Sequence, residues 1–208
     1  QIDPQHYEAH LCIITTFKDY YSSPRIYEGN DLKNIDERIP IIEAYTRLVK
    51  MQPLNAKAYS LRANLYSEIG DSFADRCIED RLREAAKRGE WYKELRVRMN
   101  RECHKFLTVK PNDKDKDIAY DYHQKALADY NKIIEIDPEN SDYYADRCAF
   151  KTGSLKDHKG ALLDCKKALA IESDVGAYTR TLAQVLENLG DFKSACTHFK
   201  RACSLGGS

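Results

Sequence analysis

The cysteines and histidines of this chain are the residues best suited to bind a metal or to take part in catalysis. Two pairs lie close together in sequence: Cys103 with His104, and Cys196 with His198. Metal ligands on a helix usually stand three or four residues apart, because that spacing places them on one face. Cys196, Phe199 and Cys203 have a spacing that predicts an apolar helix face instead. Core packing is therefore favoured over metal binding, and we expect no metal and no cofactor.

Two other arrangements that could bind ions or do catalysis are incomplete. Asp113, Asp115 and Asp117 alternate like the start of a calcium loop, but Ile118 and Gln124 stand where the loop needs glycine and a bidentate glutamate. A solvated loop is the better interpretation. The sequence has no glycine-rich phosphate loop, and its six histidines are scattered. We therefore expect no enzyme activity.

The seven cysteines bear on redox state and location. They stand at 12, 77, 103, 148, 165, 196 and 203, an odd number with no CxxC pair. Several fall at helix-core spacing among alanines and leucines, which favours reduced, buried thiols over a disulfide framework. A cytoplasmic protein is the prediction. No apolar run reaches the roughly 18 residues that a membrane span requires, so we expect no membrane partner.

Charge patterning narrows the choice of partner. The 33 basic and 33 acidic residues cancel, which argues against nucleic acid. One basic patch stands out, because Arg98, Arg101 and Lys105 follow helical spacing opposite an apolar stripe. It is either the solvated face of an amphipathic helix or a docking patch for an acidic partner, the acidic N-terminal segment of this chain included.

The elements that position these residues follow from an internal repeat. Aligned on Ala126, Ala161 and Ala195, at spacings of 35 and 34, three stretches match: KALADYNKIIEIDP (125–138), GALLDCKKALAIES (160–173) and SACTHFKRACSLG (194–206). Apolar residues recur in each at three- and four-residue steps, which predicts a helix. A further helix is predicted at 57–71, 142–153 and 177–191, with turns at Gly70-Asp71 and Gly190-Asp191.

The stretches AYSLRANLYSEIGD and AYTRTLAQVLENLGD, the latter followed by FKSACTHFKRACSLG, resemble the tetratricopeptide repeat family. That family pairs two antiparallel helices over about 34 residues. The resemblance implies an all-α fold in which such pairs stack into a right-handed superhelix, an αα-solenoid. It also assigns small residues to the helix contacts and aromatic residues to the space beside them: Ala63, Ala183, Ala195 and Ala202, with Phe192 and Phe199.

Four to five repeats are expected in a single domain, at about 1–55, 56–89, 90–139, 140–174 and 175–208. The second repeat is expected to pair helices at about 56–69 and 72–88. Residues 72–120 lack the alanine pattern, so they are the irregular part of the array. The alternative is an irregular helical bundle.

The resemblance implies that a protein or peptide binds in a concave groove lined by the first helix of each repeat. The corresponding positions are Lys57, Ser60, Asn64, Asp142, Arg180 and Gln184. The alternative is that these residues bind no partner and simply form the solvated faces of their helices. One subfamily clamps a chaperone's C-terminal carboxylate, which Asp146 would repel. Arg62 and Arg147 fit the YxxR pattern of such proteins, and they can equally pair with acids between helices.

The sequence therefore predicts a non-catalytic scaffold for protein–protein interaction. The alternative is self-association into a homo-oligomer, because the apolar helix at 195–205 has no obvious polar cap after it. A helical metalloprotein or enzyme is a third and weaker interpretation.

Overall fold

The computed structural model describes residues 33–87 and 114–206, and every regular element in these ranges is a helix. In chain order they are α2 (Lys33–Met51), α3 (Ala56–Lys87), α5 (Lys114–Ile136), α6 (Ser141–Phe150), the π turn η3 (Lys151–Leu155), α7 (His158–Ile171), α8 (Gly176–Asn188) and α9 (Phe192–Ser204). The predicted all-α solenoid is confirmed.

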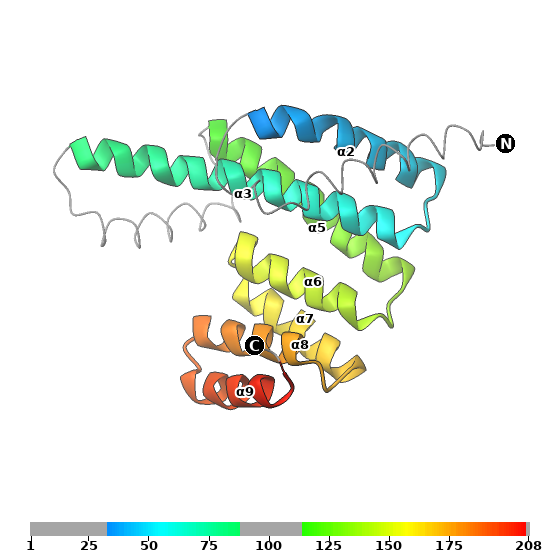
Figure 1. Cartoon of the computed structure of the whole chain (residues 1–208), viewed down its shortest axis with the longest axis vertical. Helices are drawn as coiled ribbons and strands as arrows, with labels where there is room; N and C mark the ends of the chain where they lie inside the picture. The colour runs from blue at the N-terminus through cyan, green and yellow to red at the C-terminus, as the bar shows by residue number, and fades with distance from the viewer. Residues whose placement is uncertain (1–32, 88–113, 207–208) are drawn as a thin grey trace.

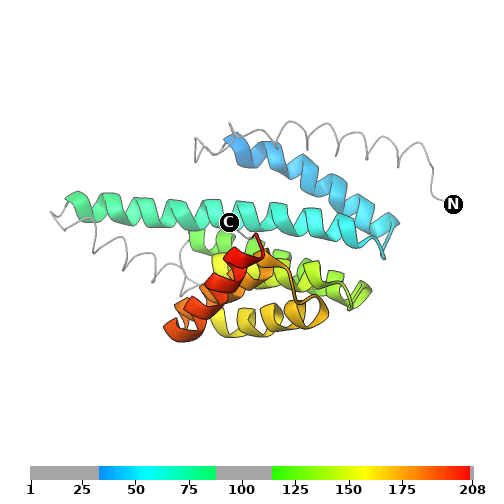
Figure 2. The ribbon, with the colours of Figure 1, turned by 60° about the horizontal axis from the view of Figure 1, so that its bottom comes forward.

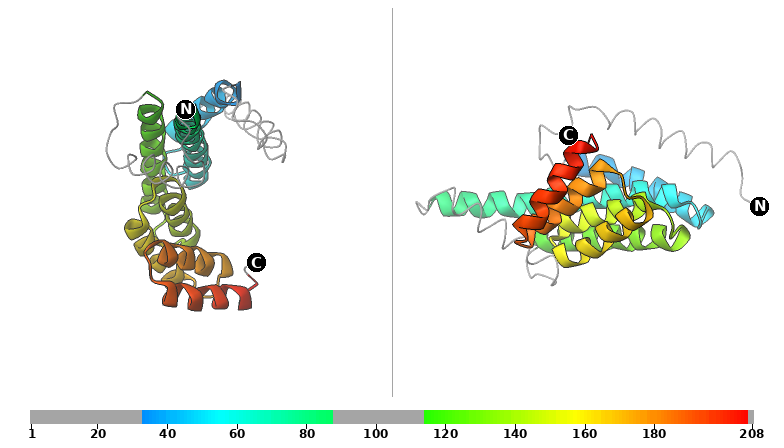
Figure 3. Two further views of the ribbon diagram at one scale, coloured as in Figure 1. Left: turned by 90° about the vertical axis from the view of Figure 1, so that its left-hand side faces the viewer. Right: turned by 90° about the horizontal axis from the view of Figure 1, so that it is seen from below.

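The helices form pairs that stack from α2 at one end to α9 at the other (Figure 1). The pairs are α3 with α5, α6 with α7, and α8 with α9, while α2 packs on α3. The stack is curved, and both ends bend towards the side on which α3 lies (Figure 3, left). The far end of α3 projects beyond the other described helices (Figure 2). The division into four to five repeats stays a prediction.

Small residues lie where paired helices touch. The aligned alanines of the second helices, Ala126, Ala161 and Ala195, are 0%, 0% and 3% exposed. The contact positions of the first helices, Ala63 and Ala183, are both 0% exposed. A small side chain at each position lets two backbones approach closely, which fixes the packing of one repeat. The predicted contact slots are confirmed.

One predicted turn is correct and the other is wrong. Gly190 has a φ of 85°, a left-handed conformation that favours glycine, and it joins α8 to α9. Gly70 is instead inside α3, which continues to Lys87. The predicted separate helix at 72–88 is therefore wrong as a partner for 56–69, and α5 takes that place.

The packing around Gly70 explains the error. A Cβ added at Gly70 would lie 2.4 Å from Cδ2 of His123, a residue of α5 that is 0% exposed. Glycine is present because the imidazole of the partner helix lies against the backbone there. The same residue type thus serves as a turn at 190 and as a packing surface at 70.

Candidate interaction surfaces

Three successive first helices expose equivalent residues on one face. Asn64 of α3, Ala149 of α6 and Gln184 of α8 are all exposed, and each directly follows a fully buried contact residue. Lys57 and Asp142 are exposed near the starts of α3 and α6. We call this set, Lys57, Asn64, Asp142, Ala149 and Gln184, the first-helix face.

The remaining predicted groove residues behave differently from one another. Arg180 of α8 is exposed, as expected of a residue that meets a partner. Ser60 is only 7% exposed, so the expectation that it is open to a partner is wrong. It lies three residues before Ala63, on the flank of α3 that packs inside the array. A shift of one or two positions in register was enough to misplace it.

Hydrogen bonds hold two residues of the first-helix face in place. The Tyr130 hydroxyl of α5 donates to Asn64 Oδ1 at 2.6 Å. The Tyr178 hydroxyl of α8 donates to Asp142 Oδ1. Burial, with this bond to Asp142, raises the pKa of Tyr178 to about 12, so the phenol stays a donor at neutral pH. The face is thus built on ordered side chains, which lowers the entropy that binding would cost.

The electrostatic centre of this face lies on α6. Asp142 and Asp146 stand one turn apart, and both are exposed. Partial desolvation raises the pKa of Asp146, the charge of Asp142 raises it further, and Lys57 acts in the opposite direction. Two carboxylates therefore crowd each other, with one lysine of α3 near enough to offset them in part.

The two arginines of the YxxR pattern pair with acids between helices. Arg62 Nε and Nη2 donate to the two carboxylate oxygens of Asp129, each at 2.8 Å, and Nη1 donates to Thr46 at 3.1 Å. The Arg62 and Asp129 side chains are 13% and 6% exposed. Burial lowers the pKa of Arg62, but the bond to Asp129 and its charge outweigh burial and raise it. This pair joins α2, α3 and α5.

The same pairing recurs in the next repeat. Arg147 donates to Asp164 through Nε at 2.9 Å and Nη2 at 2.6 Å, and Lys151 Nζ lies 2.8 Å from the same carboxylate. A further bond from Arg147 reaches Asn131 of α5 at 2.8 Å. Both arginines are therefore used inside the array, and their side chains are not offered to a partner's carboxylate.

A polar cluster around the buried His123, at the junction of α3, α5 and η3, was not foreseen from the sequence. His123 Nε2 lies 3.0 Å from Asp71 Oδ1, and the Ser154 hydroxyl donates to Asp71 Oδ2 at 3.0 Å. Ser67 Oγ and Ser154 Oγ are 3.1 Å apart. His123 also packs edge-on against Phe150, with ring centroids 5.9 Å apart. The cluster ties the irregular helix α3 to the regular part of the stack.

The cysteine prediction is wrong for one pair. Cys148 of α6 and Cys165 of α7 form a disulfide, and they are 0% and 1% exposed. Their burial agrees with the core spacing expected of several cysteines, but the tertiary fold brings these two together within one helix pair. No CxxC pattern marks them, because the 17-residue separation runs through the end of α6, η3 and the first half of α7. The disulfide links the two helices covalently.

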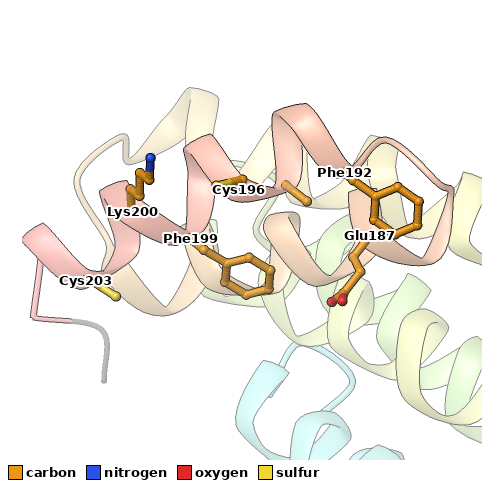
Figure 4. A pocket seen from close by; sticks show the side chains of 7 residues that line it. Glu187, Phe192, Cys196, Phe199, Lys200 and Cys203 are labelled. Atoms are coloured by element: carbon orange, nitrogen blue, oxygen red, sulfur yellow. The ribbon is translucent and has the colours of Figure 1, made fainter.

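The terminal helix α9 carries the stripe predicted from Cys196, Phe199 and Cys203, but the stripe is on the surface. Both cysteines are exposed, and Phe192, expected to fill space beside the contact alanines, is 69% exposed. The expectation of core packing is therefore wrong here. Figure 4 shows these residues along α9 beside Glu187 of α8. An open apolar groove is lined by Glu187, Phe192, Ala195, Cys196, Phe199, Lys200 and Cys203.

The predictions about a basic patch, metal binding and membrane insertion concern other parts of the chain. Arg98, Arg101 and Lys105 lie outside the described residues, so the basic patch stays a prediction. Among the side chains that the structure describes, those of residues 38–75 and 117–206, no three cysteine, histidine or acidic groups gather as metal ligands would. In the same part of the chain, no helix combines the length and the hydropathy of a membrane span.

Comparison with known proteins agrees with the helical-repeat architecture. Residues 181–205 match the family model described as tetratricopeptide repeat. Hsc70-interacting proteins 1 and 2 of Drosophila melanogaster are each 35% identical over 82 residues, or 39% of this chain and 21% of theirs. The matching segment thus spans about a fifth of those relatives.

Solved structures with some likeness include a thermophilic TPR protein of Thermus thermophilus, at 17% identity and a TM-score of 0.41, covering 84% of this chain and 86% of that one. MamA is also 17% identical, with a TM-score of 0.38, covering 85% of this chain and 94% of its own. The paired and stacked helices define an α-helical repeat protein. The internal repeat and the match over residues 181–205 make this chain similar to tetratricopeptide-repeat proteins.

Proposed function

We propose that this chain is a non-catalytic scaffold that binds a segment of another protein along the first-helix face. The observation that carries the proposal is the recurrence of exposed Asn64, Ala149 and Gln184 at equivalent places on α3, α6 and α8. A face that repeats from helix to helix is suited to an extended segment, because successive residues of the segment meet successive helices. A protein partner also fits the balanced charge of the chain.

The charges on this face indicate what the bound segment carries. On α6, the charge of Asp142 raises the pKa of Asp146, and the charge of Lys57 lowers it only in part. A cationic side chain placed between these two carboxylates would relieve their repulsion, whereas a carboxylate would add to it. We propose a segment with lysine or arginine at the position that meets α6.

Arginine placed at one exposed alanine tests the site. Ala149→Arg puts a long cationic side chain on the first-helix face, and Ala170→Arg makes the same change on α7, at another exposed helical position. Proteins retained from an extract of the source cells by the wild-type chain should be lost with Ala149→Arg and kept with Ala170→Arg. If both variants retain the same proteins, the first-helix face is not the binding site.

Hsc70 is a specific partner to test, because two relatives with 35% identity bear that interaction in their names. Purified Hsc70 should be titrated against the wild-type chain and the two alanine variants. Its isolated C-terminal peptide, which ends in a carboxylate, should bind poorly, because Asp142 and Asp146 repel negative charge. Tight binding of that peptide to the first-helix face would contradict the proposed preference for cationic segments.

The cytoplasmic location expected from the sequence stays a prediction. A disulfide between Cys148 and Cys165 favours an oxidising compartment, because the cytosol keeps protein thiols reduced. Imaging the tagged chain in its own cells, with mass spectrometry of the Cys148 and Cys165 peptides from the same cells, tests location and oxidation state together.

A further inference from the structure

The groove on α9 occupies a place that, on α7, is covered by the next helix. The 34-residue step that relates Ala161 to Ala195 also relates Leu162, Cys165 and Leu169 of α7 to Cys196, Phe199 and Cys203 of α9. On α7 these three residues pack in the cluster that includes Leu182 and Val185 of the next helix, α8. On α9 the equivalent cysteines are exposed. The α9 groove is thus a stacking surface that no described helix covers.

We propose that this groove is a homodimer interface in which α9 of one copy packs antiparallel against α9 of a second copy. The interface continues the stacking of α8 on α7, with the second copy taking the place of the next helix. It is distinct from the first-helix face, since α8 contributes Glu187 to the groove and a different residue, Gln184, to that face.

The spacing of the apolar residues suits a two-fold pairing. A two-fold interface must be complementary to itself, so each residue meets the partner residue at the mirrored place along the helix. Phe192, Cys196, Phe199 and Cys203 are symmetric about the midpoint between Thr197 and His198. Antiparallel pairing about that point sets Cys196 against Phe199 and Phe192 against Cys203, which fills the groove with a large side chain opposite each small one.

The charges at the groove agree with the same arrangement. Glu187 lies at the Phe192 end of the groove, and Lys200 lies towards the Cys203 end (Figure 4). Reversing the direction of the second copy brings each Lys200 towards the Glu187 end of the other. A parallel pairing would instead set lysine beside lysine and glutamate beside glutamate, at a cost in free energy.

The geometry predicts which cysteine can link the two copies. In the antiparallel pair, the two Cys196 residues are offset by three residues, or about 4.5 Å along the helix axis. With helices about 9 Å apart, their Cα atoms come within about 6.5 Å, inside the range that a disulfide spans. The two Cys203 residues are offset by eleven residues, or about 16 Å, which no disulfide spans.

Oxidative crosslinking tests the pairing. Cys12, Cys77 and Cys103 are replaced by serine, Cys148 and Cys165 are kept, and one chain retains only Cys196 of α9 while the other retains only Cys203. Mild copper-catalysed oxidation should yield at least about five-fold more disulfide dimer from the Cys196 chain on a non-reducing gel. Equal yields from the two chains, or more from the Cys203 chain, would overturn the antiparallel arrangement.

A variant pair separates loss of the interface from loss of the fold. Phe199→Asp should abolish the Cys196 crosslink, whereas Thr197→Asp, an exposed position of α9 outside the groove, should keep it. Because Phe199→Asp could also disturb α9, a charge exchange provides a second reading. Glu187→Lys or Lys200→Glu alone should lower crosslinking, and the two together should restore it. An unchanged yield in the single variants would contradict the proposed ion pair.

The interface is one helix wide, so the dimer is expected to be weak. Sedimentation of the wild-type chain with its thiols kept reduced should show a dimer at roughly 0.1–1 mM that dissociates on dilution. A monomer throughout this range would overturn the proposal, and so would a dimer that persists in Phe199→Asp with its helicity intact.

Discussion

His123 packs against Gly70. Replacing Gly70 with alanine should therefore destabilise the wild-type chain but stabilise a variant that lacks the His123 side chain. Alanine normally stabilises a helix interior relative to glycine by about 1 kcal/mol. At Gly70 the new Cβ would lie 2.4 Å from Cδ2 and 2.5 Å from Nε2 of His123. Ordinary contacts between carbon atoms are about 3.5–4.0 Å, so the imidazole must move by about 1 Å or more.

The surroundings make that movement costly. His123 is 0% exposed, and its Nε2 is 3.0 Å from Asp71 Oδ1. Overpacking costs about 1–3 kcal/mol, and weakening this hydrogen bond adds about 1 kcal/mol. After the gain in helix propensity is subtracted, Gly70→Ala should destabilise the chain by about 1–3 kcal/mol. In His123→Ala the obstacle is absent, and the same change should stabilise by roughly 1 kcal/mol.

Urea unfolding followed by circular dichroism at 222 nm provides the measurement, with midpoints compared among wild type, both single variants and the double variant. Gly153→Ala is the matched control, because a Cβ there meets nothing within 4 Å. Its midpoint should stay the same or rise slightly. If Gly70→Ala raises the midpoint equally with and without His123, the close packing described for this junction is wrong.

Three further predictions follow from buried pairs and from charge. Arg62→Ala should lower the free energy of unfolding by about 3–5 kcal/mol, because it leaves Asp129 buried without a partner, whereas Arg62→Met with Asp129→Leu should cost much less; urea midpoints distinguish the two. Dithiothreitol should lower stability by about 3 kcal/mol by opening the Cys148–Cys165 loop, and a chain with alanine at both positions should show no response to the reductant. Asp146→Asn should raise the melting temperature at pH 7 and lose that advantage as pH falls through the aspartate range. The raised pKa of Asp146 means that the folded state favours its neutral form, so the stability this group contributes is present at low pH and lost as it ionises; an equal effect at pH 3 would contradict this.

The repeat could be predicted because it depends on local pattern. The spacing of Ala126, Ala161 and Ala195 is visible in one dimension, since a helical contact position needs a small residue once in every repeat. The same logic placed Ala63 and Ala183 correctly. The first-helix face was partly predictable, because exposure follows from the same register, although Ser60 shows that an error of one or two positions buries a residue expected to be open.

The roles of individual cysteines and aromatic residues could not be predicted, because they depend on which helix comes next. Cys165 and Phe199 occupy equivalent positions of α7 and α9. Cys165 is covered by α8 and bonded to Cys148, whereas Phe199 lines an open groove that no described helix covers. Equivalent positions therefore have opposite environments, because a sequence pattern does not specify whether another helix packs against it.

The sequence alone determined that this chain is a stack of paired helices, because hydrophobic period, small contact residues and the turn at Gly190 act within a few residues of one another. Only the tertiary structure decided how the irregular segment joins that stack. It runs α3 straight through Gly70 because His123, 53 positions along the chain, packs on the glycine and bonds to Asp71. Such a contact is set by the folded geometry of two helices, and no local propensity encodes it.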